Sequence, residues 1–175
     1  MCILYISNKL FSCNFLEARV VSSQRYEVDE RGRYEYVILY PSVAKRPTVS
    51  SLINGATAVS NPKPARTLES TIREIIGGEE ANKKCRKGIC GKPDFIKNGL
   101  PGEIKTFNGN IKYNVLEKGI CQAALYAWIF HRDVAYLVIG IYQPVNEGEA
   151  EIKEIIELSL RLERVNERKI EAIAQ

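Results

Sequence analysis

Residues 89–107 read ICGKPDFIKNGLPGEIKTF, and this stretch decides how the chain folds. It contains two largely apolar segments, 89–96 and 102–107, with Asn98-Gly99 between them. Asn-Gly is typical of the two-residue turn of a β-hairpin, because both turn residues take a positive φ. The stretch therefore predicts a β-hairpin.

The hairpin would bring three charged side chains together. Side chains alternate along a strand, so Glu103 and Lys105 lie on one face, and Asp94 on the partner arm can lie beside Glu103. Two neighbouring carboxylates repel each other unless a cation lies between them, and Mg²⁺ or Mn²⁺ prefers such oxygen ligands. Lys105 would orient an attacking water or offset charge that builds up on phosphorus. The ordinary alternative is a surface hairpin with an exposed Glu–Lys pair.

The segments around the hairpin predict an α/β fold. Apolar residues at helical spacing predict one helix from Thr67 to Gly77-Gly78 and another at about 115–130. The continuous apolar run 134–142 predicts a strand that is buried on both faces. Residues 149–174 predict a long amphipathic helix. This order of elements predicts a central mixed sheet that is flanked by helices.

The length of 175 residues is that of one domain, so residues 1–175 are predicted to form a single domain. Residues 17–41 predict a second β-hairpin, and 48–53 predict a short helix. We therefore expect an N-terminal hairpin extension at about 1–46 and a core at about 67–175.

Three motifs follow one another in the chain. They are C-G-K-P-D-F-I at 90–96, G-E-I-K-T-F at 102–107 and C-Q-A-A-L-Y-A-W at 121–128. In this order they resemble the PD-(D/E)xK nuclease superfamily, and within it the RecB-like branch, which includes the CRISPR adaptation nucleases. The resemblance covers about residues 67–142. It implies a restriction-endonuclease-like core and a metal-dependent enzyme that hydrolyses phosphodiester bonds in DNA.

The resemblance also implies roles for individual residues. Asp94, Glu103 and the carbonyl oxygen of Ile104 would bind Mg²⁺ or Mn²⁺, Lys105 would be the catalytic lysine, and Gln122 and Tyr126 would line the site and contact the DNA or the catalytic residues.

Many members of the family place a glutamate on the first core helix, where this chain has Glu69 and Glu74. Glu69 flanks the apolar face of the predicted helix and Glu74 projects from the far side, so Glu69 is the predicted further ligand. A solvated helix carboxylate is the ordinary alternative for both. RecB-like exonucleases often carry a metal-binding His ahead of the Asp. Here the only His is His131, for which a helix-capping or core role is expected instead.

The net charge is +4, and the stretch between Lys83 and Lys92 contains five basic residues and no acidic one. Such a cluster can neutralise phosphates, although it can equally be a solvated basic loop. The predicted nucleic-acid contacts are Lys84, Arg86, Lys87, Lys92 and Tyr126.

Five cysteines form an odd count, which argues against a secreted disulfide framework. Cys85 and Cys90 have no second close pair, so no iron–sulfur cluster is expected, and buried thiols or one Cys85–Cys90 bridge remain as alternatives. The sequence has neither a long apolar run nor a signal-peptide pattern, so we expect a cytoplasmic protein without membrane contact.

Two other functions remain open. One is a catalytically inactive module of the same fold that binds DNA ends or junctions. The other is an interaction protein that forms a homodimer through the predicted C-terminal helix, whose apolar stripe runs from Ile152 to Val165. The same motifs are compatible with endonucleolytic or exonucleolytic cutting and with an RNA substrate.

Overall fold

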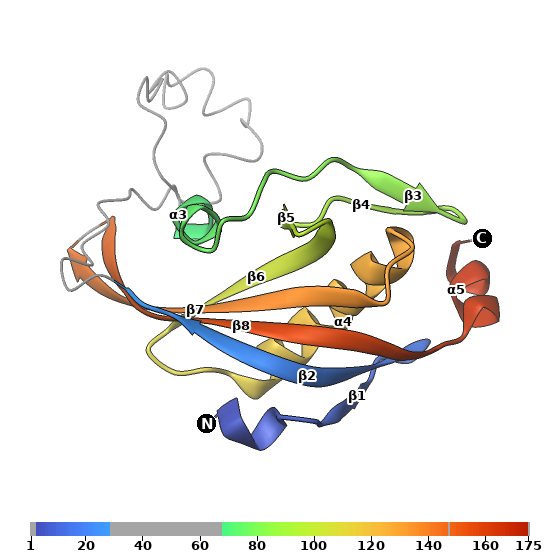
Figure 1. Ribbon diagram of the computed structural model, residues 1–175, viewed down its shortest axis with the longest axis horizontal. Helices are drawn as coiled ribbons and strands as arrows, with labels where there is room; N and C mark the ends of the chain where they lie inside the picture. The colour runs from blue at the N-terminus through green and yellow to red at the C-terminus, as the bar shows by residue number, and fades with distance from the viewer. Residues whose placement is uncertain (1–2, 29–67, 147, 175) are drawn as a thin grey trace, which may run out of the picture.

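The computed structural model describes residues 3–28, 68–146 and 148–174, and it shows an α/β fold on a mixed β-sheet (Figure 1). The described elements are the 3₁₀ helix η1 (Ile3–Ile6), β1 (Leu10–Ser12), β2 (Leu16–Tyr26), α3 (Leu68–Ile75), β3 (Lys84–Arg86), β4 (Ile89–Gly91), β5 (Phe95–Lys97), β6 (Leu100–Asn108), α4 (Tyr113–Ile129), β7 (Val134–Asn146), β8 (Glu149–Val165) and α5 (Glu167–Ala174). Within the described residues, six strands form a sheet in the order β1-β2-β8-β7-β6-β5, and β3 pairs with β4 alone. The predicted mixed sheet is therefore confirmed.

The hairpin predicted at Asn98-Gly99 is formed by β5 and β6, which pair antiparallel. Asn98 has a φ of 53° and Gly99 a φ of 74°, as a two-residue hairpin turn requires. Gly102 on β6 faces the ring of Phe95 so closely that an added Cβ would lie 2.0 Å from that ring. Only glycine leaves room for this contact, which holds the two arms together.

β6 and β7 are parallel, and α4 makes the crossover between them. The predicted helix at about 115–130 and the predicted strand at 134–142 are thus confirmed. Residues 135–140 of β7 are all buried, in agreement with a strand that is covered on both faces.

The two faces of the sheet are covered by different helices, and in Figure 1 α3 lies above the strands while α4 passes behind them. Ile120 of α4 packs in one apolar cluster with Leu137 of β7. Ile72 of α3 packs in another with Val138, the next residue of β7. The helix predicted from Thr67 is confirmed over Leu68–Ile75, while Thr67 itself lies outside the described residues.

The long helix predicted at 149–174 is wrong. Residues 149–165 form the strand β8, and only Glu167–Ala174 are helical. The register of β8 shifts at Lys153, so Ile152 and Ile155 both face the α3 side, whereas Ile156 and Leu158 face the α4 side. Burial on both faces and this irregularity together imitate helical spacing.

This correction affects the dimer hypothesis, which relied on a helical stripe from Ile152 to Val165. That stripe belongs to the core of the sheet, so homodimerisation stays a prediction without a helical surface to support it. Among the described helices, none has the length and apolarity that crossing a membrane requires.

The N-terminal part of the chain differs from the prediction. β2 confirms a strand within 17–41, but its described partners are β1 and β8. The predicted second arm of that hairpin and the predicted helix at 48–53 lie outside the described residues.

Candidate active site

Asp94 is fixed beside β6 by two hydrogen bonds. Its backbone N–H donates to the carbonyl oxygen of Gly102 at 3.0 Å, and its Oδ2 accepts from the N–H of Ile104 at 2.7 Å. The residue lies in the short loop just before β5, where the sequence analysis places a strand. These bonds hold the carboxylate next to the part of β6 that contains Glu103 and Lys105.

The carbonyl oxygen of Ile104, a predicted ligand, is directed to the same edge of β6 as Asp94. β5 has only three residues, and its register with β6 ends at Gly102. The N–H of Ile104 points to this edge because it bonds to Asp94. The N–H and C=O of one strand residue point to the same side, so the carbonyl oxygen of Ile104 also points to this edge.

Glu103 and Lys105 lie on the face of the sheet that α4 covers, together with Phe107. Glu103 is only 7% exposed. Lys105 passes so close to Gly119 of α4 that an added Cβ there would lie 2.8 Å from the Lys105 Cγ. A glycine on the helix thus makes room for a lysine that packs between the helix and the sheet.

Three carboxyl groups and Lys105 meet around this edge of the sheet, and we call them the acidic group (Glu69, Asp94, Glu103, Lys105). Glu69 belongs to α3, which covers the opposite face from α4, and its carboxyl interacts with Asp94 and Lys105. The group therefore wraps around the edge, with Asp94 in the middle. The predicted metal ligands come together in space.

The two glutamates of the acidic group hold their protons tightly. Burial raises the pKa of Glu103 from 4.5 to about 9, with the hydrogen bond and the negative charge of Asp94 adding to the effect and Lys105 opposing it. Glu69 is an exposed residue of α3, but partial desolvation of its carboxyl raises its pKa from 4.5 to about 7, again with contributions from Asp94. Lys105 and, at Glu69, Arg73 offset these effects only in part, so the folded chain favours the protonated forms of Glu69 and Glu103.

Tyr126 of α4 closes the site from the side of the β3–β4 hairpin. Its ring lies against Gly91, where an added Cβ would come within 2.6 Å of the ring. Burial raises the pKa of Tyr126, and the charges of Glu103 and Asp94 raise it further. Gln122 is exposed, and its position on α4 lies between Gly119 and Tyr126 on the side that contacts the acidic group.

The donor chemistry of the acidic group suits a hard divalent ion, because carboxylate and carbonyl oxygens are the preferred ligands of Mg²⁺ and Mn²⁺. However, among the described residues no three His, Cys, Asp or Glu side chains are arranged as a ready metal site. Glu69 and Glu103 are each hydrogen-bonded with Asp94, so their oxygens bond to each other instead of pointing at a common centre.

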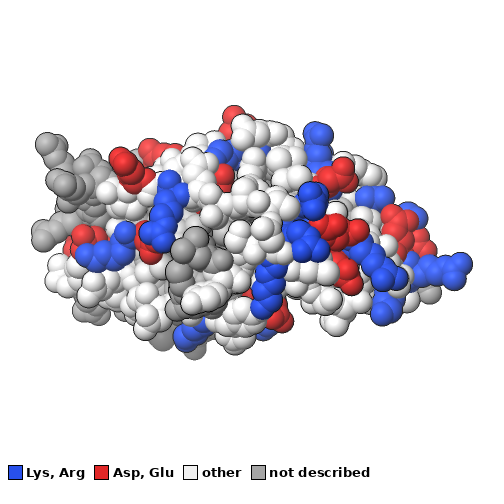
Figure 2. Space-filling view, turned by 60° about the horizontal axis from the view of Figure 1, so that its bottom comes forward, with Lys and Arg blue, Asp and Glu red and all other residues white. Residues whose placement is uncertain are grey.

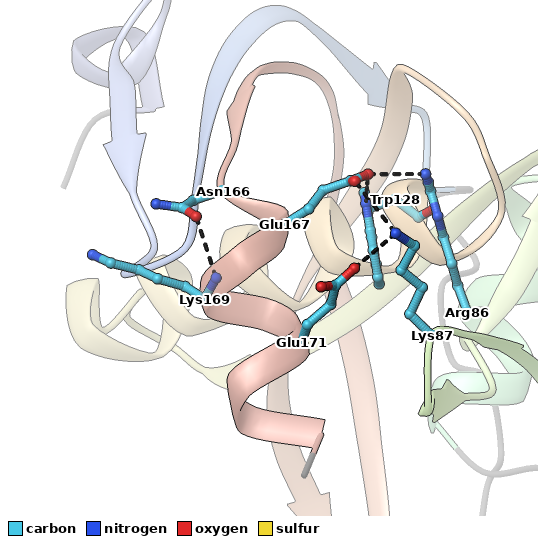
Figure 3. Close-up of polar contacts among 7 residues, drawn as sticks. All are labelled: Arg86, Lys87, Trp128, Asn166, Glu167, Lys169 and Glu171. Carbon is cyan, nitrogen blue, oxygen red and sulfur yellow. Dashed lines mark hydrogen bonds and ion pairs between the residues drawn. The ribbon is translucent and has the colours of Figure 1, made fainter.

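The predicted nucleic-acid contacts on the β3–β4 hairpin are engaged within the chain. Lys84 lies over the ring of Phe130 at 4.7 Å, and Lys92 pairs with Glu80 at 3.5 Å. Arg86 and Lys87 form ion pairs with acidic residues of α5, as Figure 3 shows. On the face drawn in Figure 2, the described Lys and Arg side chains are interspersed with Asp and Glu.

Four of the five cysteines are paired. The Cys85–Cys90 bridge joins β3 to β4, which agrees with one of the two predicted alternatives. A second bridge, Cys13–Cys121, joins the turn between β1 and β2 to α4. This second bridge is not predicted by the sequence, because nothing in a separation of 108 residues indicates a contact.

His131 lies at the C-terminal end of α4 and is exposed. Its φ is 55°, and the N–H of the next residue, Arg132, donates to the Ala127 carbonyl oxygen at 2.8 Å. This is the left-handed residue that commonly ends a helix, so the expected capping role agrees with the structure.

A second group of buried polar side chains was not predicted, and we call it the balanced group (Tyr26, Lys97, Glu157). Lys97 Nζ lies 2.9 Å from Glu157 Oε2, and the Tyr26 hydroxyl bonds to both residues. The side chain of Glu157 is 6% exposed and that of Lys97 18%. The three residues come from β2, β5 and β8, so the chain offers no local pattern that would reveal them.

Comparison of this chain with protein-family models, curated proteins and solved structures finds no match. What the chain does must therefore be argued from the acidic group and its surroundings.

Proposed function

We propose that this protein is a divalent-metal-dependent DNA nuclease that hydrolyses phosphodiester bonds at the acidic group. The observation that carries this proposal is the convergence of Glu69, Asp94 and Glu103 around Lys105, with raised pKa values for Glu69 and Glu103. Clustered carboxyl groups at the edge of a sheet are unfavourable for folding alone. A bound cation would remove that disadvantage.

In this proposal Asp94, Glu103 and the Ile104 carbonyl oxygen hold Mg²⁺ or Mn²⁺, and Glu69 adds a further ligand. The ion would polarise the phosphate and make water a better nucleophile. Asp94 keeps its orientation through the bond that Ile104 donates to it. Lys105 is held in place by packing against Gly119 and stabilises negative charge on the phosphate. Gln122 and Tyr126 contact the DNA.

The proposed fold is a restriction-endonuclease-like core. It is supported by the order α3, β5, β6, α4, β7, in which the acidic group, Gln122 and Tyr126 all fall at one edge of the sheet. A cytoplasmic location is part of the same proposal and has no separate support.

The proposal is tested by cleavage of linear and circular DNA, single- and double-stranded, with Mg²⁺, Mn²⁺ or EDTA. Wild type is compared with Glu103→Ala and Lys105→Ala, and Glu74→Ala on the far side of α3 serves as a control. We expect metal-dependent cutting that both site variants lose and the control keeps. Circular substrates separate endonucleolytic from exonucleolytic cutting. Equal cutting by all four proteins would contradict the proposal.

The alternative function is a catalytically inactive DNA-end or junction-binding module. It is favoured by the side-chain arrangement, in which no metal site is ready among the described residues. Wild type that binds DNA but does not cut it with either metal would support this alternative.

A further inference from the structure

The C-terminal helix α5 packs against the β3–β4 hairpin and the end of α4 (Figures 1 and 3). Ile170 of α5 is 1% exposed and lies in an apolar cluster with Trp128. Ile89 of the hairpin and Tyr126 of α4 pack against the same cluster. The helix therefore shares a packing unit with a residue of the candidate active site.

Glu167, the first residue of α5, joins three elements. Its Oε1 accepts a hydrogen bond from Trp128 Nε1 at 3.3 Å and pairs with Arg86 Nη2 at 3.1 Å. Arg86 in turn donates to the Trp128 carbonyl oxygen at 2.7 Å, and its guanidinium lies 4.4 Å from the centre of the Trp128 ring. An isolated exposed ion pair contributes little, but Glu167 binds an arginine and a buried indole together.

The contacts among Glu167, Arg86 and Trp128 bear on the position of Tyr126. In the described residues, β3 and β4 form no backbone ladder with the large sheet, so the hairpin depends on α4 and α5 for its position. Arg86 anchors the hairpin to α4 two residues after Tyr126. At the other end of the hairpin, Gly91 lies against the Tyr126 ring. The ring is thus held between the hairpin and the acidic group.

We propose that Glu167 is a positioning residue of the active site, which acts through Arg86 and Trp128 to hold the Tyr126 ring against Gly91. This inference rests on the proposed nuclease function and extends it to the C-terminal helix. Glu167 itself touches no residue of the acidic group.

Glu171 provides a matched control on the same helix. It pairs with Lys87 at 2.7 Å, and no contact with Arg86 or Trp128 is formed by Glu171 within the described residues. Glu167→Ala and Glu171→Ala each remove one negative charge, so both increase the general attraction of DNA equally. A difference between them must come from the contacts that Glu167 makes.

The first test measures kcat and KM for DNA cleavage in both variants. We expect Glu167→Ala to lower kcat about tenfold with little change in KM, as loss of an indirect contact to an active site does. Glu171→Ala should stay within about twofold of wild type. In a Tyr126→Phe background, Glu167→Ala should have no further effect, because both changes act through the same ring. Equal effects of the two alanine variants, or additive effects with Tyr126→Phe, would overturn the inference.

The second test does not need cutting. The pKa of Tyr126 is measured from the phenolate absorbance that wild type shows and Tyr126→Phe lacks. We expect this raised pKa to fall towards 10 in Glu167→Ala and to stay raised in Glu171→Ala. A pKa that is unchanged in Glu167→Ala would reject the positioning role. If wild type does not cut DNA, the nuclease proposal fails while this titration still decides whether Glu167 positions Tyr126.

Discussion

The balanced group and the acidic group each surround one buried glutamate, Glu157 in the first and Glu103 in the second, but they differ in how their charges balance. In the balanced group, one lysine faces one glutamate, and a tyrosine hydroxyl bonds to both. In the acidic group, three carboxyl groups meet around Lys105, and Arg73 acts on Glu69 as a second cation. The balanced group satisfies its own charges, whereas the acidic group does not.

This difference separates a structural role from a functional one. Burial lowers the pKa of Lys97, but hydrogen bonds to Tyr26 and Glu157 raise it above its ordinary value, so the ion pair is well compensated. Glu69 and Glu103 instead have raised pKa values, because burial and the neighbouring Asp94 both favour their protonated forms. Strongly shifted pKa values often mark functional sites, and the proposed function assigns a divalent cation to this group.

The sharpest test of the comparison exchanges one carboxylate in each group for its amide. We expect Glu103→Gln to lower cutting by at least about 100-fold, because even indirect metal contacts have effects of 10–100-fold. The same change should increase metal-free stability at pH 8, since the amide does not need the proton that Glu103 must take up on folding at that pH. Glu157→Gln should do the reverse, with cutting retained and stability reduced. Cleavage assays and urea unfolding measure both effects, and loss of cutting in both variants would remove the distinction.

Breaking the balanced group from its other side should have the next largest effect. Lys97→Met leaves Glu157 buried without a cationic partner, so we expect a loss of about 3 kcal/mol in the free energy of unfolding. Lys153→Met is the control, because it removes an exposed pair with Glu151 at 3.1 Å on the same strand as Glu157. That control should change stability by less than about 1 kcal/mol. Similar values for the two variants would mean that Lys97 and Glu157 are not a buried pair.

The pH dependence of stability should separate the two groups. In the acidic group, Glu69 and Glu103 have pKa values of about 7 and about 9 when folded, against 4.5 ordinarily. Between about pH 4.5 and pH 9 the folded state therefore binds more protons than the unfolded state, and metal-free stability should fall as pH rises. Lys97 has a raised pKa when folded. Its contribution to stability is therefore complete below pH 10.5, the ordinary pKa of lysine, and is lost only at higher pH.

Divalent metal should reverse this fall. Mg²⁺ at about 100 times its Kd should add about 2.7 kcal/mol to the free energy of unfolding at pH 8. The gain should shrink towards pH 5, where protons compete for the same oxygens. This gain in stability is measured by thermal unfolding with Mg²⁺ or EDTA at several pH values. A sample with NaCl at the same ionic strength in place of the divalent salt controls for charge screening. If the metal-free protein became more stable as pH rises, the raised pKa values of Glu69 and Glu103 would be contradicted.

The smallest effect should come from a change outside both groups. His131 has a φ of 55° at the end of α4, where glycine is favoured. His131→Gly should therefore increase stability by up to about 1 kcal/mol without altering cutting. A loss of cutting would show that His131 takes part in the reaction, in conflict with a purely capping role.

The sequence predicts those parts of the molecule that depend on local patterns. The β5–β6 hairpin follows from Asn98-Gly99, and the closeness of Asp94 to Glu103 follows from pairing across this hairpin, although Asp94 itself lies in the loop before β5. β8 was mistaken for a helix, because a register shift at Lys153 and burial on both faces give an apolar pattern that fits a helix as well. The prediction failed where tertiary pairing, not spacing, decides the structure.

The remaining features of the site need the three-dimensional structure. That α3 brings Glu69 around the sheet edge to Asp94 was expected from the family resemblance, but helical spacing alone does not distinguish it from a solvated glutamate. The link from Glu167 to Trp128 and the balanced group both join residues far apart in the chain. Neither feature produces a periodic pattern of residues in the sequence.

The Cys13–Cys121 bridge has a topological consequence. It closes a covalent ring in the chain, and all four members of the acidic group lie within that ring. A single backbone cut by a protease anywhere between the two cysteines would open the ring without releasing a fragment. Such a nicked molecule would run as one species on a non-reducing gel and separate into two only after reduction.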